Sequence, residues 1–297
     1  DAEALRVRNA AIINLARFDG STYKEAPVTE EMAATAADTL EGLIPESPGN
    51  GTALVNYLRY RSQEIVGLFE ETEDARAEYD ALREWVDQLA NSARDVPPDE
   101  TAVPTERAML HLNISRAYTQ LGRLGGALEQ VETAGSLSAA TGLRSGQDPE
   151  LEKAVRDIQQ DYNELARDQL ALAVQKIDAE RDGKLDDYVQ IRQSYSQSLE
   201  TLGQLAEAEE ESRELLEVRP WDVCASQQLV DILIRQNKFG EAVEVAETAI
   251  ARAAEPLPEI PGPAGQSARR WRWTLELLLA DALLAQSKSV TGGERAE

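Results

Sequence analysis

Several long helical stretches in this sequence are joined by connections of only two residues. Apolar residues recur every three or four positions almost throughout the 297 residues, and no segment shows the strict alternation of a strand. Gly122-Arg123, Gly203-Gln204 and Asn237-Lys238 each separate two helical stretches. A connection this short forces the helices on either side to lie antiparallel as neighbours. We therefore predict an all-α protein that is built from helical hairpins.

Clusters of Pro and Gly mark where the helices end. The breaks lie at residues 45–51, 97–104, 142–149 and 256–265. Between them the periodicity predicts helices over residues 2–17, 29–43, 51–70, 73–94, 104–121, 124–140, 149–181, 184–202, 205–218, 221–236, 239–253 and 266–288. A hairpin with one apolar face buries that face only against another hairpin, so we expect the hairpins to stack.

A pattern of bulky and small residues recurs at a spacing of 34 residues in the C-terminal half. One copy consists of Tyr195-Ser196, Leu199, Gly203, Leu205, Ala208, Leu215 and Pro220, and the next of Leu229-Val230, Leu233, Asn237, Phe239, Ala242, Ala246 and Ala249. An earlier copy consists of Ile114-Ser115, Tyr118, Gly122, Leu124, Ala127, Val131 and Ala134, and a partial copy begins at Leu279-Ala280 and Leu283. Over about 120 residues this pattern resembles the tetratricopeptide repeat (TPR) family. Asn237 stands where the TPR pattern has its turn glycine, and Asn also tolerates the left-handed backbone.

The resemblance implies a right-handed α-α superhelix, a TPR-like solenoid of antiparallel helix hairpins, with one long bracing helix. We expect four segments: an N-terminal helical segment (1–50), TPR-like hairpins (51–147), a long linking helix (148–183), and TPR repeats with a C-terminal capping helix (184–297). The long helix carries a coiled-coil-like seam of Val155, Ile158, Tyr162, Leu165 and Leu172. It either braces the solenoid or links two repeat blocks, and dimerisation through the seam is the alternative.

The charge of the chain limits its partners. Acidic residues outnumber basic ones by 54 to 30, which gives a net charge of -24 and a surface that repels phosphate backbones and anionic lipid headgroups. We therefore expect no nucleic acid partner. The longest apolar run, Leu275–Ala285, is interrupted by Glu276 and Asp281, so we expect no direct membrane insertion. The excess of Arg over Lys fits a GC-rich or salt-adapted bacterial source.

The single cysteine and the first residue leave the compartment open between cytoplasm and periplasm. Cys224 is the sole cysteine, so the chain forms no internal disulfide. The chain begins at Asp1, which fits either an excised fragment or a mature form that has lost a signal peptide.

The sequence offers few residues for catalysis or metal binding. His111 is the sole histidine and fits a structural position on a helix, so neither a conventional zinc site nor a Ser-His-Asp or Cys-His nucleophile has its parts. The segment Asp178–Asp186 resembles an EF-hand loop, but Val189 replaces the acid that should close it, and a polar turn is the alternative. We expect no catalytic residue, no cofactor and no metal.

The TPR resemblance implies a partner-binding surface on the concave side, which is lined by the first helix of each hairpin. The inward polar positions are Arg116 and Gln120 in the early copy, Gln193 and Gln197 in the next, and Gln227, Asp231 and Arg235 in the one after. The alternative is that these are ordinary solvated helix positions. Trp271 lies in a cluster with Trp273, Arg269, Arg270 and Arg272. It is either a contact hot spot or packs against the preceding repeat.

These features favour a non-catalytic protein–protein interaction scaffold. It would bind a protein or peptide on its concave helical surface, as a component of a larger complex. The alternative is a regulatory or sensor TPR module of a longer chain, such as a kinase or a secretion component. A third alternative is an enzyme with an unfamiliar helical active site.

Overall fold

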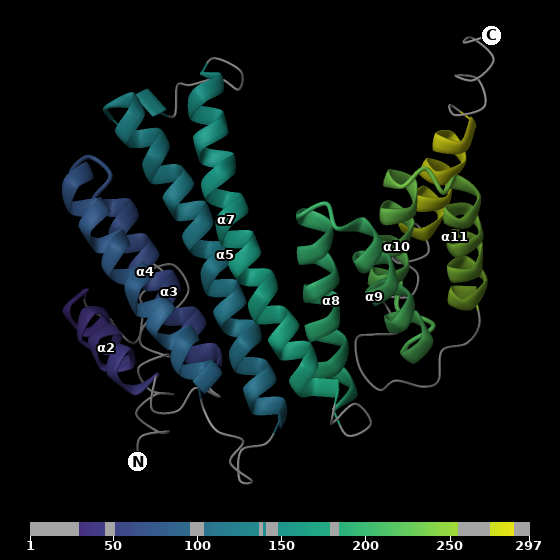
Figure 1. Ribbon diagram of the computed structural model, residues 1–297, viewed down its shortest axis with the longest axis horizontal. Coiled ribbons are helices and arrows are strands. Elements are labelled where there is room, and N and C mark those ends of the chain that lie inside the picture. Colours follow the sequence, from purple (N-terminus) through teal and green to yellow (C-terminus); the bar gives the residue numbers. More distant parts are fainter. Residues whose placement is uncertain are drawn as a thin grey trace, which may run out of the picture. The chain divides into compact units, whose positions relative to one another are not determined.

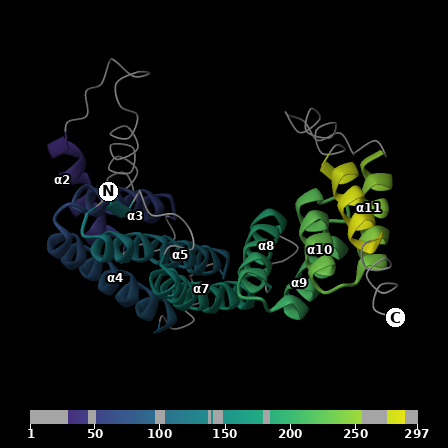
Figure 2. The same cartoon turned by 90° about the horizontal axis from the view of Figure 1, so that it is seen from above.

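The described part of the chain is helical throughout. The computed structural model (Figures 1 and 2) describes residues 30–44, 51–95, 104–136, 139–140, 148–178, 184–254 and 274–287, and contains no strand in these ranges. The helices are α2 (Glu30–Leu43), α3 (Gly51–Gly67), α4 (Thr72–Asp95), α5 (Pro104–Ala134), α7 (Pro149–Ile177), α8 (Leu185–Thr201), α9 (Leu205–Val218), α10 (Val223–Arg235), α11 (Phe239–Ala254) and a last helix over residues 274–287. The prediction of an all-α protein is therefore confirmed for these residues. The expected helix over residues 2–17 lies outside them.

The chain divides into two compact units, which we describe separately. Unit 1 comprises residues 1–191 and unit 2 comprises residues 192–297, so the boundary lies within α8.

The hairpin turn that we expected at Gly122-Arg123 is wrong, because α5 runs without interruption from Pro104 to Ala134. The glycines of α5 lie in the contact with α7 and do not form a turn. A Cβ atom on Gly122 would lie 2.8 Å from Cβ of Tyr162, and one on Gly126 would lie 3.1 Å from Cγ1 of Val155. Only residues without a side chain let the backbone of α5 approach α7 this closely.

Helices α5 and α7 form a long antiparallel pair in unit 1 (Figure 1). His111 on α5 is 2% exposed, and its Nδ1 atom lies 2.8 Å from Oε1 of Gln169 on α7. Burial lowers the pKa of this imidazole and so favours its neutral form. His111 is thus a buried residue that packs within the α5–α7 pair, which agrees with the structural position that the sequence predicted. Of the expected seam, Val155 and Tyr162 are buried against α5, whereas Leu165 is 37% exposed.

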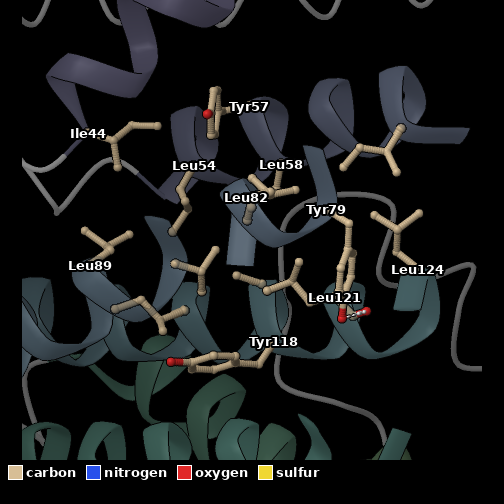
Figure 3. Packing of buried hydrophobic residues seen from close by; sticks show 14 of the residues in the cluster. Ile44, Leu54, Tyr57, Leu58, Tyr79, Leu82, Leu89, Tyr118, Leu121 and Leu124 are labelled. Carbon is tan, nitrogen blue, oxygen red and sulfur yellow. Dashed lines mark hydrogen bonds between the residues drawn. The ribbon is translucent and has the colours of Figure 1, made fainter. Parts of the chain in front are cut away.

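Aromatic and aliphatic side chains from α3, α4 and α5 form the core of unit 1 (Figure 3). The hydroxyls of buried tyrosines in this core have polar partners. The Tyr79 hydroxyl lies 2.7 Å from that of Tyr162, and Tyr118 donates to Oδ1 of Asp87 at 2.9 Å. These bonds satisfy polar groups that burial would otherwise penalise.

In unit 2, α8–α9 and α10–α11 are two helical hairpins with equivalent turns. Gly203 (φ 74°) and Asn237 (φ 61°) both adopt the left-handed conformation. After each, the next backbone N–H closes a Schellman cap: Gln204 N–H donates to the Leu199 carbonyl, and Lys238 N–H to the Leu233 carbonyl. Both two-residue connections are therefore turns, as the sequence predicted.

Positions 34 residues apart in these hairpins are buried alike. The pairs are Ser196 and Val230, Leu199 and Leu233, Ala208 and Ala242, Ser212 and Ala246, and Leu215 and Ala249. Ile232 on α10 packs with Leu199 and Ala208 and thereby joins the hairpins. The last helix then buries Leu275, Leu278 and Ala282 against α10 and α11, beside which it lies in Figure 1.

Replacing Gly122 by Ala should destabilise unit 1. At a free helix position Gly→Ala stabilises by about 0.5–1 kcal/mol, but here the new methyl overlaps Tyr162, and such overpacking costs about 1–3 kcal/mol. We expect a lower free energy of unfolding in urea denaturation followed by circular dichroism. Gly42→Ala is the matched control, because a Cβ there has nothing within 4 Å. Equal stability of the two variants would contradict the close α5–α7 contact.

Candidate functional site

Five of the expected partner-binding residues lie on α8 and α10 of unit 2, and we call them the first-helix face. They are Gln193, Gln197, Gln227, Asp231 and Arg235. Gln197, Asp231 and Arg235 are exposed, whereas the other two are half-buried. The structure thus leaves three of the five open to a partner.

Arg235 connects the two hairpins on this face. Its guanidinium lies 2.8 Å from Oε1 of Glu200 on α8 and also donates to the Glu200 backbone carbonyl at 3.3 Å. The Arg235–Glu200 pair therefore links α10 to α8 in addition to lying on the first-helix face. Gln193 is likewise engaged, since its side chain is hydrogen-bonded to Cys224 at the start of α10.

Asp231 lies where three helices of unit 2 meet. Although Asp231 is accessible to solvent, the neighbouring helices remove part of the hydration of its carboxyl and thereby raise its pKa. The carboxylates of Glu200 on α8 and Asp281 on the last helix raise the pKa further, and Arg235 acts in the opposite direction. The first-helix face is thus a surface of one carboxylate, one guanidinium and three amides, and its carboxylate is electrostatically coupled to neighbouring charges. Its chemistry is hydrogen bonding and charge recognition.

Arg116 and Gln120 belong to unit 1, where they line a small cavity of about 230 Å³. Val55, Leu58 and Arg59 on α3 form its other side. Partial burial lowers the pKa of the Arg116 guanidinium, which donates to Oδ1 of Asn113 at 3.3 Å. The sequence did not point to Arg59, because nothing local indicates that α3 and α5 are neighbours.

A larger groove of about 590 Å³ lies between α9 and α11 and was not predicted. It is lined by Arg213, Leu216, Glu217, Pro220, Ser226, Leu229, Glu241, Glu244, Val245, Thr248, Ala249 and Arg252. We call it the second-helix groove, since α9 and α11 are the second helices of their hairpins. Sequence reasoning followed the first helices only and therefore missed it.

Some predicted features fall outside the described residues. Trp271 does, and so do residues 179–183 of the EF-hand-like segment. Within the described ranges, no group of three or more His, Cys, Asp or Glu side chains is placed to hold a metal ion. No helix in these ranges combines the length and the apolar character that a membrane span requires.

Comparison with protein-family models and with curated proteins gives no match to this sequence. The functional interpretation therefore depends on the residues and geometry described above.

Replacing Asp231 by Asn should stabilise the protein at pH 7. Because the folded-state pKa is raised, ionising Asp231 costs more free energy in the folded than in the unfolded protein. Above the folded-state pKa this cost lowers the free energy of unfolding. As the pH falls through that pKa toward the unfolded value, the carboxyl becomes protonated and the cost disappears. The difference in unfolding free energy between Asp231→Asn and wild type should therefore shrink from pH 7 to pH 4. A difference that is independent of pH would contradict the raised folded-state pKa of Asp231.

Proposed function

We propose that this chain is a non-catalytic interaction scaffold that binds a peptide or partner protein on its first-helix face. The observation that carries the proposal is the equivalence of the two hairpins in unit 2. Their turns at Gly203 and Asn237 are capped by the same hydrogen bonds, and their packing positions repeat every 34 residues. Stacked equivalent hairpins bring the outer residues of successive first helices together as one continuous binding surface.

The wider architecture in this proposal is a TPR-like, right-handed superhelix that forms part of a larger complex. The spacing of bulky and small residues supports it, because the equivalent pattern residues of the two hairpins are buried: Ser196, Leu199, Ala208 and Leu215 in the first, and Val230, Leu233, Ala242 and Ala249 in the second. Unit 2 alone provides the hairpins on which the proposal rests.

The side chains of the first-helix face suit recognition of a polypeptide backbone. An amide such as Gln197 or Gln227 offers both a donor and an acceptor, which matches the alternating C=O and N–H groups of an extended peptide. Asp231 adds a carboxylate that accepts hydrogen bonds from amides or cations. Arg235, held by Glu200, is already positioned, so little side-chain entropy is lost when it contacts a ligand.

Affinity capture from the native source tests this function. The face variant Gln197→Ala/Gln227→Ala/Asp231→Ala removes exposed and half-buried polar groups but keeps Arg235, which joins the hairpins. We expect recovery of the specific partner to fall at least about tenfold, which corresponds to about 1.4 kcal/mol of binding free energy. Quantitative mass spectrometry of the captured proteins measures it.

The matched control carries three alanines on the second helices, at exposed positions outside the groove. Glu207→Ala/Glu210→Ala/Glu247→Ala should retain the partner at the wild-type level. Circular dichroism and urea denaturation show whether both variants fold as the wild type does. If the face variant is folded and still recovers the partner fully, the first-helix face is not the binding surface.

A further inference from the structure

The second-helix groove has an apolar floor between two walls that carry both acidic and basic side chains. Leu229 and Ala249 are buried in the floor, and Leu216 and Val245 are half-buried on either side. A volume of about 590 Å³ lies within the range of roughly 300–1,000 Å³ that is typical of ligand pockets in proteins. An open groove with these walls therefore accommodates several aliphatic side chains of a partner.

Two arginine contacts connect the α9 side of the groove to α11. Arg213 on α9 lies 2.6 Å from Oε2 of Glu241 on α11. Arg252 on α11 donates to the backbone carbonyl of Pro220, just beyond α9, at 3.0 Å. Because both contacts cross between the helices, they favour the observed spacing of the walls. A preformed groove loses less entropy on binding than one that must open.

The lining of the groove carries a net negative charge, because Glu217, Glu241 and Glu244 outnumber Arg213 and Arg252. Arg213 is paired with Glu209 and Glu241, whereas Arg252 donates to the neutral Pro220 carbonyl and keeps its own charge. Glu217 on α9 and Glu244 on α11 are exposed, and neither is paired with a cation among the described residues. A partner that fills the apolar floor therefore meets two carboxylates at its edges, and a cationic partner satisfies them.

We propose that the second-helix groove binds an amphipathic segment of another protein, with bulky aliphatic residues on one face and Lys or Arg beside them. The aliphatic side chains pack on Leu216, Leu229 and Val245, and the basic residues pair with Glu217 and Glu244. A second copy of this acidic chain would add like charge to the rim. This surface is separate from the first-helix face, so its failure and that of the proposed function are distinguishable.

Fluorescence anisotropy with two labelled synthetic peptides tests this inference. One is an amphipathic helix with Leu on one face and Lys along its borders, and the other has Glu in place of every Lys. We expect the Lys peptide to bind wild-type protein, more weakly as salt rises, and the Glu peptide not to bind. Failure of the Lys peptide to bind would overturn the proposal, and sedimentation showing that the groove is occupied by a second copy would also do so.

Two variants locate the binding in the groove. Thr248→Trp fills it from an exposed lining position, and Glu217→Lys/Glu244→Lys reverses its unpaired charges. Each should weaken the Lys peptide at least tenfold, and the charge-reversed protein should gain affinity for the Glu peptide. Their matched controls are Glu247→Trp, on the adjacent exposed residue of α11, and Glu207→Lys/Glu210→Lys, with the same change in net charge outside the groove.

The controls and the Gln197→Ala/Gln227→Ala/Asp231→Ala variant should bind the Lys peptide as the wild type does. If Glu217→Lys/Glu244→Lys and its control Glu207→Lys/Glu210→Lys weaken binding equally, the peptide is attracted by the overall acidic surface, and the groove assignment is wrong. Full binding by a folded Thr248→Trp protein would lead to the same conclusion.

Discussion

The left-handed backbone at Gly203 and Asn237 is the constraint on which unit 2 depends. In each case the positive φ lets the chain reverse directly after a helix, while the Schellman hydrogen bonds satisfy carbonyls that the helix end leaves free. The reversal places α9 against α8 and α11 against α10. Stacking of the two hairpins then creates both surfaces of interest, one on the first helices and one between the second helices.

Apolar packing holds these hairpins together, and ion pairs connect them at the surface. Ile232 contacts Leu199 and Ala208 at the centre of the stack, where burial of apolar area supplies most of the stability. The surface pair of Arg235 and Glu200, like that of Lys238 and Glu209, is worth only about 0–1 kcal/mol. Such pairs connect the hairpins at the surface, while the buried apolar contacts supply the packing between them.

Local sequence information was sufficient where one residue decides the conformation. The turn at Asn237 was predictable because Asn is among the few residues that adopt a positive φ readily. The same reasoning failed at Gly122, because a glycine that terminates a helix and one that lets another helix approach look alike in sequence. Tyr162, forty residues further along the chain, distinguishes the two cases, since it occupies the space that a side chain at Gly122 would need.

The sequence by itself determined the helical class, most helix boundaries, the burial of His111 and the repeating positions of the C-terminal hairpins. These properties follow from periodicity and backbone preference, which act over a few residues. Only the tertiary structure decided that α5 is continuous, that Arg59 shares a cavity with Arg116, and that a groove lined by exposed carboxylates lies between α9 and α11. The reason is that each of these depends on which distant helices become neighbours. Helix faces of similar composition do not indicate, from the local sequence, which other helix they will pack against.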